Sequence, residues 1–138
     1  MLWTVAAAGL LVSCGAASGG GTTPTPSPGR DVVATDSDKG KTIDLHVGDR
    51  LEVRLASTYW TVDQGSDERV LRPSGPMAVS PQMSGCVPGG GCGFVIARFD
   101  AVGPGSADVT ASRTSCGEAL RCVGDAGSYR VSVAVSTA

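Results

Sequence analysis

The cysteines are the residues whose type and spacing point most directly to chemistry. Four of the five form two pairs, each with five intervening residues: Cys86 with Cys92, and Cys116 with Cys122. The N-terminal residues indicate export, and an even number of cysteines in an exported chain predicts disulfides. Three connectivities are possible, and the equal spacing favours two bridges within loops, each stabilising by about 2 kcal/mol.

A zinc site built from the same four cysteines is the alternative. Zinc-binding cysteine pairs usually have two to four intervening residues rather than five, and an oxidising compartment disfavours free thiolates. We therefore expect two disulfides that make the loop tips rigid, with no metal and no other cofactor.

The fifth cysteine, Cys14, follows an apolar run from Leu2 to Val12. That run is too short to span a hydrocarbon core, which needs about 20 residues, and it suits the apolar region of a signal peptide. Residues 11–15 (Leu-Val-Ser-Cys-Gly) resemble the bacterial lipobox, in which the cysteine is acylated. We expect a lipoprotein signal peptide at residues 1–13 and lipidation of Cys14, which anchors the exported chain to the outer face of the cell membrane. An ordinary secretory signal with a chance cysteine is the alternative.

The remaining reactive side chains form no catalytic group in the sequence. His46 is the only histidine, and its place among alternating apolar residues favours an exposed strand residue over a catalytic base. Residues 36–40 (Asp-Ser-Asp-Lys-Gly) lack the later carboxylates of a calcium loop, and we expect a polar turn there. The glycines at 89–91 lack the helix and lysine of a phosphate loop. We expect no enzyme activity.

Composition favours one all-β domain. The chain has 138 residues, 41% of them hydrophobic but only 4% aromatic, so its core must consist mainly of valine, leucine, isoleucine and alanine. A net charge of −2 with acidic and basic residues interspersed provides no basic patch. We therefore expect no binding to nucleic acid.

A low-complexity segment precedes the expected domain. Residues 14–30 consist of Gly, Ser, Ala, Thr and Pro after the cysteine, with no charged side chain before Arg30. Such a segment cannot bury enough apolar surface to offset its ordering entropy. We expect a disordered tether from Cys14 to a folded domain at 31–138.

Alternation of apolar and polar residues places the strands. The residues expected to face the core are Ile43, Leu45 and Val47, then Leu51, Val53 and Leu55, and in the last strand Tyr129, Val131, Val133 and Val135. Trp60 should begin a strand, with its ring in the core and its indole N–H on a backbone carbonyl. Short edge strands are expected at 70–73 and 77–79, where prolines are tolerated.

The stretch from 89 to 115 predicts a central β-hairpin. Residues 94–102 and 107–113 have strand length and flank a Gly-Pro-Gly turn, so we expect them to pair in an antiparallel sheet. The outer ends of such a hairpin, with both cysteine pairs, would lie at the same edge of the domain. Together these elements predict an Ig-like antiparallel β-sandwich of about seven strands, with no helix longer than a turn.

The order of features from Thr42 to Val135 resembles the chagasin-type inhibitors of papain-like cysteine proteases, a family of Ig-like β-sandwiches. The resemblance lies in residues 43–49 (Ile-Asp-Leu-His-Val-Gly-Asp) with the strand after them, the glycines before Phe94, residues 101–103 (Ala-Val-Gly), Arg113 and the valine-rich last strand. It implies that three loops at one end of the sandwich fill a protease cleft.

The loop motifs themselves differ from the family pattern. An Asn-Pro-Thr-Thr-Gly loop is replaced by residues 56–60 (Ala-Ser-Thr-Tyr-Trp), and a Gly-x-Gly-Gly loop is approximated by residues 89–91. The third loop, Arg-Pro-Trp in the family, keeps Arg113 but continues with Thr114.

We therefore expect a monomeric surface lipoprotein whose loops bind a protein or peptide partner. The expected contact residues are Thr58, Tyr59, Gly89, Gly90, Gly91, Arg113 and Thr114. Two alternatives remain open: an inhibitor of papain-like cysteine proteases, which the resemblance implies, and a structural envelope protein.

Overall fold

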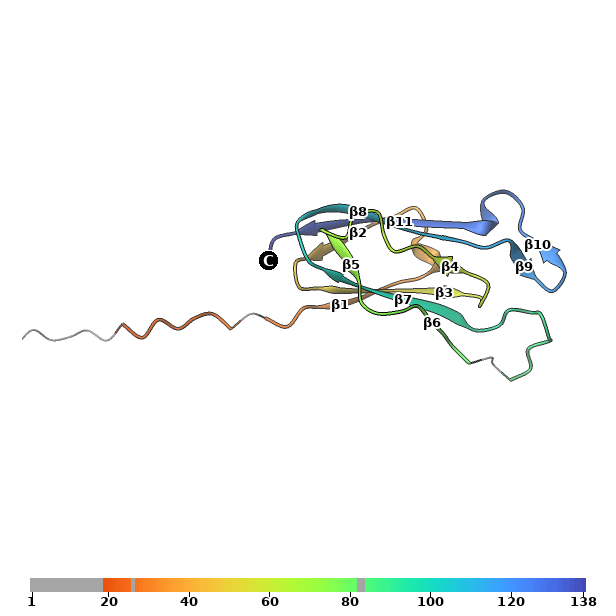
Figure 1. Cartoon of the computed structure of the whole chain (residues 1–138), viewed down its shortest axis with the longest axis horizontal. Coiled ribbons are helices and arrows are strands. Elements are labelled where there is room, and N and C mark those ends of the chain that lie inside the picture. The colour runs from red at the N-terminus through yellow and green to blue at the C-terminus, as the bar shows by residue number, and fades with distance from the viewer. Residues whose placement is uncertain (1–18, 26, 82–83) are drawn as a thin grey trace, which may run out of the picture.

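Two β-sheets pack face to face in this chain (Figure 1). The computed structural model describes residues 19–25, 27–81 and 84–138. The expected signal peptide at 1–13 and the lipidation site Cys14 lie outside these residues, so both stay predictions. Among the described helices, none is long and apolar enough to cross a membrane.

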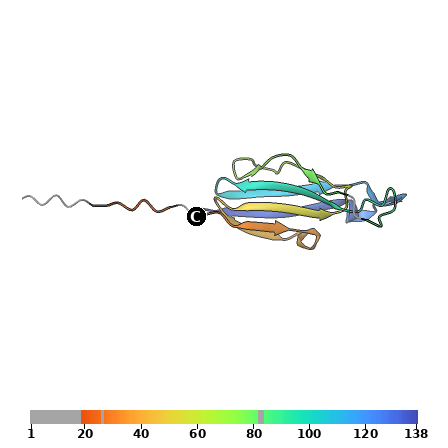
Figure 2. The same ribbon diagram turned by 90° about the horizontal axis from the view of Figure 1, so that it is seen from below.

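The first sheet contains five strands. Their order is β1 (Asp31–Ala34), β3 (Arg50–Ala56), β7 (Phe94–Ala101) and β5 (Leu71–Pro73), and β6 (Ala78–Val79) also pairs with β7. Figure 2 looks onto this sheet, with orange β1 at one edge and green β5 and β6 at the other. Both edge segments are short, and β5 ends in Pro73, which confirms the edge strands expected at 70–73 and 77–79.

The second sheet contains four strands. Their order is β2 (Thr42–His46), β11 (Ser128–Ser136), β8 (Gly105–Ser112) and β4 (Thr61–Val62). A separate hairpin of β9 (Ser115–Gly117) and β10 (Leu120–Arg121) extends from one end. In the part of the chain that the structure describes, the helical segments are two short 3₁₀ turns, η1 (Asp36–Asp38) and η2 (Gly124–Gly127). The all-β sandwich is confirmed.

The sheets are mixed rather than purely antiparallel. Strand β1 runs parallel to β3, and β2 runs parallel to β11. The described residues contain eleven strand segments rather than about seven, because several segments of two to four residues are too short to show alternation in the sequence.

The expected hairpin between residues 94–102 and 107–113 is wrong. Strands β7 and β8 belong to different sheets: β7 lies between β3 and the edge strands, and β8 lies between β11 and β4. The intervening turn crosses from one sheet to the other. Alternation predicts which face of a strand is buried, but not whether its neighbour in sequence pairs beside it or packs across the core. Because the two strands still run in opposite directions, the residues before Phe94 and after Ser112 do lie at one end.

Alternation predicted the buried faces correctly. Leu51, Val53 and Leu55 are buried, as are Tyr129, Val131, Val133 and Val135; Leu45 is buried, whereas Ile43 and Val47 are half-buried and His46 is exposed. The Trp60 ring is 4% exposed and its Nε1–H donates to the Ala56 carbonyl at 3.1 Å, as expected. Each large apolar side chain removed from water stabilises the sandwich by about 1.5–3 kcal/mol.

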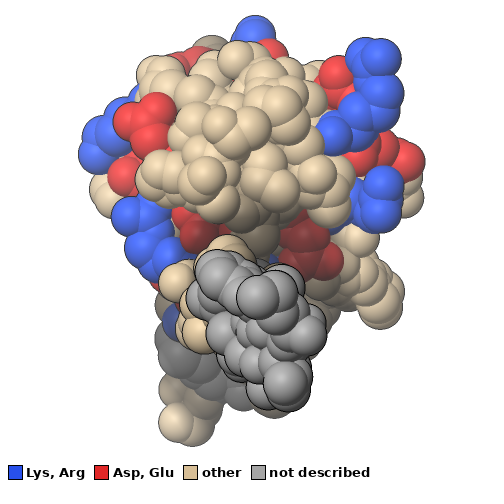
Figure 3. All heavy atoms as spheres, turned by 90° about the vertical axis from the view of Figure 1, so that its left-hand side faces the viewer, with Lys and Arg blue, Asp and Glu red and all other residues tan. Residues whose placement is uncertain are grey.

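The tether joins the sandwich at the end opposite the β9–β10 hairpin (Figure 1). Residues 19–25 and 27–30 form no helix or strand. The Arg30 amide donates to Asp49 Oδ1 at 2.8 Å and the His46 amide to Oδ2 at 2.8 Å. Both bonds lower the pKa of the buried Asp49 carboxyl, and the bond from the His46 amide lowers it more than the bond from the Arg30 amide. In Figure 3, which faces this end, acidic and basic side chains lie close together.

Candidate protein-binding site

Three loops meet at the end of the sandwich remote from the tether (Figure 1). We call segments 57–60, 84–93 and 113–127 the loop cluster. The Ser57 amide donates to the Gly93 carbonyl at 2.8 Å, and the Thr58 amide donates to the Gly91 carbonyl at 2.9 Å. The structure therefore brings the expected contact residues near 58 and 90 together through the backbone.

The Tyr59 side chain also holds the glycine-rich loop, residues 89–91, in place. Its hydroxyl donates to the Gly89 carbonyl, and its ring occupies the space that a side chain at Gly91 would need. Gly91 is buried and has a φ of +66°, so glycine is favoured there by both backbone conformation and packing. Tyr59 and Gly91, both expected to touch a partner, mainly hold the loop in place.

Arg113 positions the third loop. Its guanidinium carbon lies 4.3 Å from the centroid of the Trp60 ring, and its Nε–H donates to the Ala126 carbonyl at 3.2 Å. The Arg113 amide also donates to the Gly127 carbonyl at 2.9 Å. A cation stacked on an aromatic face and bonded to a carbonyl is a preorganised contact. Arg113 therefore couples the β8–β11 loop to the buried Trp60.

Both cysteine pairs form the expected loop-internal disulfides. Cys86 is bonded to Cys92 and Cys116 to Cys122, with Cα–Cα distances of 5.9 and 4.9 Å. This pairing contradicts the zinc alternative, because a bridged cysteine has no free thiolate to offer a metal. The bridges limit the motion of the two longer loops of the cluster.

Three large apolar side chains are exposed on the loop cluster. Val87, Leu120 and Val123 are 55%, 59% and 81% exposed. Large apolar side chains at such exposure are typical contact points for another protein. We did not predict these three residues as contacts; the available signal was an apolar residue within or beside each cysteine-bracketed loop.

The other expected contact residues differ in accessibility. Gly89 and Thr114 are exposed, whereas Thr58 and Gly90 are half-buried. A Cβ on Gly89 would lie 3.8 Å from Glu118 Cγ, so the tips of the two disulfide loops lie against each other. The three loops thus form one continuous surface rather than separate projections.

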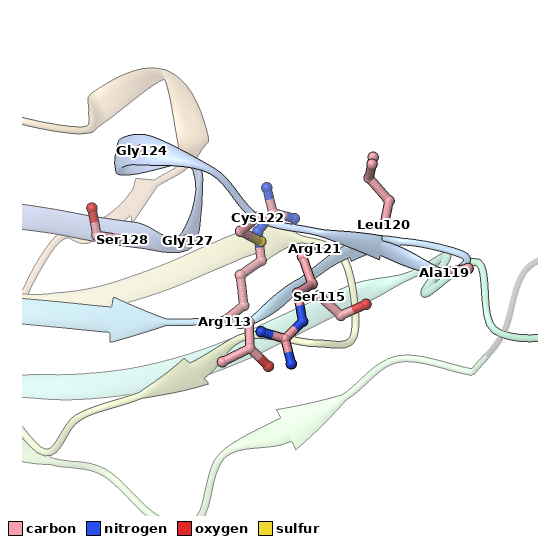
Figure 4. A pocket seen from close by; sticks show the side chains of 10 residues that line it. Arg113, Ser115, Ala119, Leu120, Arg121, Cys122, Gly124, Gly127 and Ser128 are labelled. Carbon is pink, nitrogen blue, oxygen red and sulfur yellow. The ribbon is translucent and has the colours of Figure 1, made fainter.

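An open hollow lies beside the β9–β10 hairpin (Figure 4). Its volume is about 790 Å³, and it is lined by Arg113, Thr114, Ser115, Ala119, Leu120, Arg121, Cys122, Gly124, Gly127 and Ser128. In Figure 4, Ala119 lies at the hairpin turn and Leu120 points away from the strands. The hollow combines two guanidinium groups with one exposed apolar side chain, which suits a peptide carrying both polar and apolar groups.

Backbone strain is concentrated in the same region. Ser57 and Ala119, with φ values of +107° and +52°, are the non-glycine residues with positive φ among those described. Such conformations cost of order 1–3 kcal/mol and cluster at functional sites. Both strained residues belong to the loop cluster.

Comparison with known proteins finds similarity only in structure. No protein-family model and no curated protein sequence matches the chain. The solved structure of the cysteine protease inhibitor EhICP2 from Entamoeba histolytica matches with a TM-score of 0.55 and 10% identity, covering 78% of this chain and 96% of that chain. The structure of amebosin matches with a TM-score of 0.52 and 14% identity, covering 78% of this chain and 98% of that chain.

These identities are too low to transfer a function, but they show a common fold. The expected resemblance to the chagasin-type inhibitors is thereby confirmed at the level of the fold. The chain is a β-sandwich with the fold of a structurally characterised cysteine protease inhibitor.

Proposed function

We propose that this protein inhibits papain-like cysteine proteases by inserting its loop cluster into the catalytic cleft. One observation carries the proposal: three loops are locked together at one end of a sandwich whose fold is that of a cysteine protease inhibitor. Loops fixed before binding lose little conformational entropy in the complex. A rigid projecting edge suits occlusion of a cleft.

The chemistry of the contact surface supports a protein partner. Val87 and Leu120 offer exposed apolar area, while Tyr59 and Arg113 are engaged within the protein. The residues that would contact a partner thus differ from the residues that hold the loops in place, as in other preorganised interfaces. The proposed contacts, Val87 and Leu120, therefore lie outside the Arg-Pro-Trp pattern of the chagasin-type inhibitors.

Titration of papain with the purified full chain tests this proposal. We expect stoichiometric loss of activity, and a Val87→Asp variant should weaken inhibition by at least about tenfold because it buries a charge in the interface. The matched control is Val33→Asp on β1, where the valine is 53% exposed, against 55% for Val87. Full papain activity at micromolar protein would contradict the proposal.

A second candidate is a surface lipoprotein that presents the same loops to another protein partner. One observation favours it: the tether and the loop cluster lie at opposite ends of the sandwich (Figure 1). If Cys14 is lipidated, the loops would point away from the outer face of the membrane. Incorporation of labelled palmitate should be lost in Cys14→Ala; incorporation that survives this substitution would contradict the anchor.

A further inference from the structure

The two disulfides of the loop cluster close rings of equal size on backbones with different support. Around Cys116–Cys122, Ser115 pairs with Arg121 and Gly117 with Leu120. The Cys122 amide also donates to the Thr114 carbonyl at 3.0 Å. This hairpin keeps its backbone pairing when its S–S bond is cut.

The ring closed by Cys86–Cys92 has no such ladder. Among the described residues, 84–90 pair with no strand, and a turn bond from the Gly90 amide to the Val87 carbonyl at 2.9 Å lies inside the ring. The backbone bonds to segment 57–58 are made by Gly91 and Gly93, at the Cys92 side. The Tyr59 hydroxyl donates to the Gly89 carbonyl inside the ring, so the S–S bond is the main link between residues 84–88 and the rest of the loop cluster.

The Cys86 sulfur also lies beside a glycine. A Cβ on Gly90 would lie 3.2 Å from Cys86 Sγ but also 3.0 Å from the Val87 carbonyl oxygen and 3.2 Å from Val87 Cγ2, so Gly90 and Val87 pack closely on that side of the sulfur. Cys86 is half-buried, and its neighbours Gly85 and Val87 are exposed. Access to a sulfur atom is one of the factors that set the rate of thiol–disulfide exchange.

We propose that Cys86–Cys92 is a thiol-exchange site for low-molecular-weight thiols such as glutathione, and that its opening weakens partner binding. The second half of this proposal rests on the proposed function. Opening frees the Cys86 side of the loop and with it Val87, the apolar contact beside the bridge. The Cys116–Cys122 hairpin keeps its shape under the same conditions.

The exchange balances with two thiols. A glutathione thiolate attacks Cys86 Sγ, the S–S bond breaks, and Cys92 leaves as a thiolate that takes up a proton. A second glutathione thiolate attacks the glutathione sulfur of the mixed disulfide and forms oxidised glutathione, and Cys86 leaves as a thiolate that takes up a proton. Two glutathione molecules are thus oxidised for each protein disulfide that is reduced.

Timed alkylation tests the exchange without any partner. The full chain carrying Cys14→Ser is incubated with reduced glutathione, quenched with N-ethylmaleimide at intervals and mapped by peptide mass spectrometry. We expect Cys86 and Cys92 to be modified at least about tenfold faster than Cys116 and Cys122, with the first glutathione adduct on Cys86. Equal rates, or faster opening of Cys116–Cys122, would overturn the proposal.

Matched double variants test the effect on binding. Cys86→Ser/Cys92→Ser and Cys116→Ser/Cys122→Ser are each titrated against papain that was activated and then separated from free thiol. We expect the first variant to lose inhibition by at least about tenfold and the second by less than about threefold. Equal losses of inhibition in the two variants, or a larger loss in the second, would overturn the proposal that opening Cys86–Cys92 weakens partner binding.

Hydrogen exchange separates the possible failures. Slow exchange in β3, β7, β8 and β11 shows that a variant still folds. We expect faster exchange of the Gly90 amide, which donates to the Val87 carbonyl, in the first variant only. If the first variant unfolds, the proposal is decided by which disulfide opens first in the chain that keeps both bridges, as measured by alkylation. If the bridged chain leaves papain active, the proposed function fails, while the exchange site is still judged by alkylation.

Discussion

Segments 84–93 and 113–127 each carry a disulfide between cysteines six positions apart, yet different forces hold them. The first is fastened by backbone bonds from residues 57–58 and by Tyr59. The second is fastened by its own β9–β10 pairing and by Arg113 on Trp60. Equal cysteine spacing therefore does not imply equal rigidity. On the loop-entropy model the two bridges contribute similarly, about 2 kcal/mol each, so the difference lies in what remains when a bridge opens.

Gly91→Ala should show the largest effect, because it attacks the support of the first loop directly. The added Cβ would displace the Tyr59 ring, and alanine is unfavourable at the Gly91 φ of +66°. We therefore expect a loss of about 2 kcal/mol in the free energy of unfolding. Urea denaturation measures it. In the control Gly89→Ala, φ is +78° but the nearest contact is an ordinary 3.8 Å, so about 1 kcal/mol is expected. Equal losses would show that packing under Tyr59 does not hold the loop.

Arg113→Ala should have the next largest effect and act on the second loop. Removing the stacked guanidinium and its bond to Ala126 is expected to cost about 1–1.5 kcal/mol. Thermal unfolding followed by circular dichroism measures it. The control is Arg121→Ala on the exposed strand β10, for which we expect a change within about 0.5 kcal/mol. A control that is as destabilised as Arg113→Ala would contradict a positioning role for Arg113.

Tyr59→Phe should have a smaller effect and separate local from global stability. Loss of the hydroxyl bond to Gly89 is expected to cost about 0.5–1 kcal/mol and to speed exchange of the Thr58 amide. Tyr129→Phe is the control, because it loses a bond of 3.0 Å to the Thr35 carbonyl outside the loop cluster. Burial, helped by Asp38 and Asp36, raises the pKa of Tyr129 to about 12, so this control is made below that pH. Unchanged exchange of the Thr58 amide in Tyr59→Phe would contradict a role of the Tyr59 hydroxyl in holding the loop.

Ala119→Gly should have the smallest effect, with the opposite sign. Ala119 has a φ of +52° at the hairpin turn, and glycine there should stabilise the protein by about 0.5 kcal/mol. Ala126→Gly, in η2, is the control and should destabilise by a similar amount, since its φ is not positive. Both values come from denaturant midpoints. Destabilisation by Ala119→Gly would show that the turn is not strained.

The sequence predicted that the three loops lie at one end of the sandwich, but not which of their side chains are exposed. Glycines, cysteines and Arg113 marked the three loops in the sequence. The structure shows that Tyr59, Gly91 and Arg113 hold the loops together, whereas Val87 and Leu120 are exposed apolar side chains. Whether a loop side chain points outward depends on which other loop packs beside it, and that neighbour is distant in sequence.

The all-β class, the buried face of each longer strand and the burial of Trp60 follow from the sequence, and the sequence favours the short disulfide rings among three connectivities. These follow from local properties: a period of two, a bulky apolar ring and cysteines close along the chain. The folded chain was needed to show that β7 and β8 lie in opposite sheets, that β1 runs parallel to β3 and that β2 runs parallel to β11. Alternation is the same for a strand beside its neighbour and a strand across the core, so strand partners are set by how the whole chain packs.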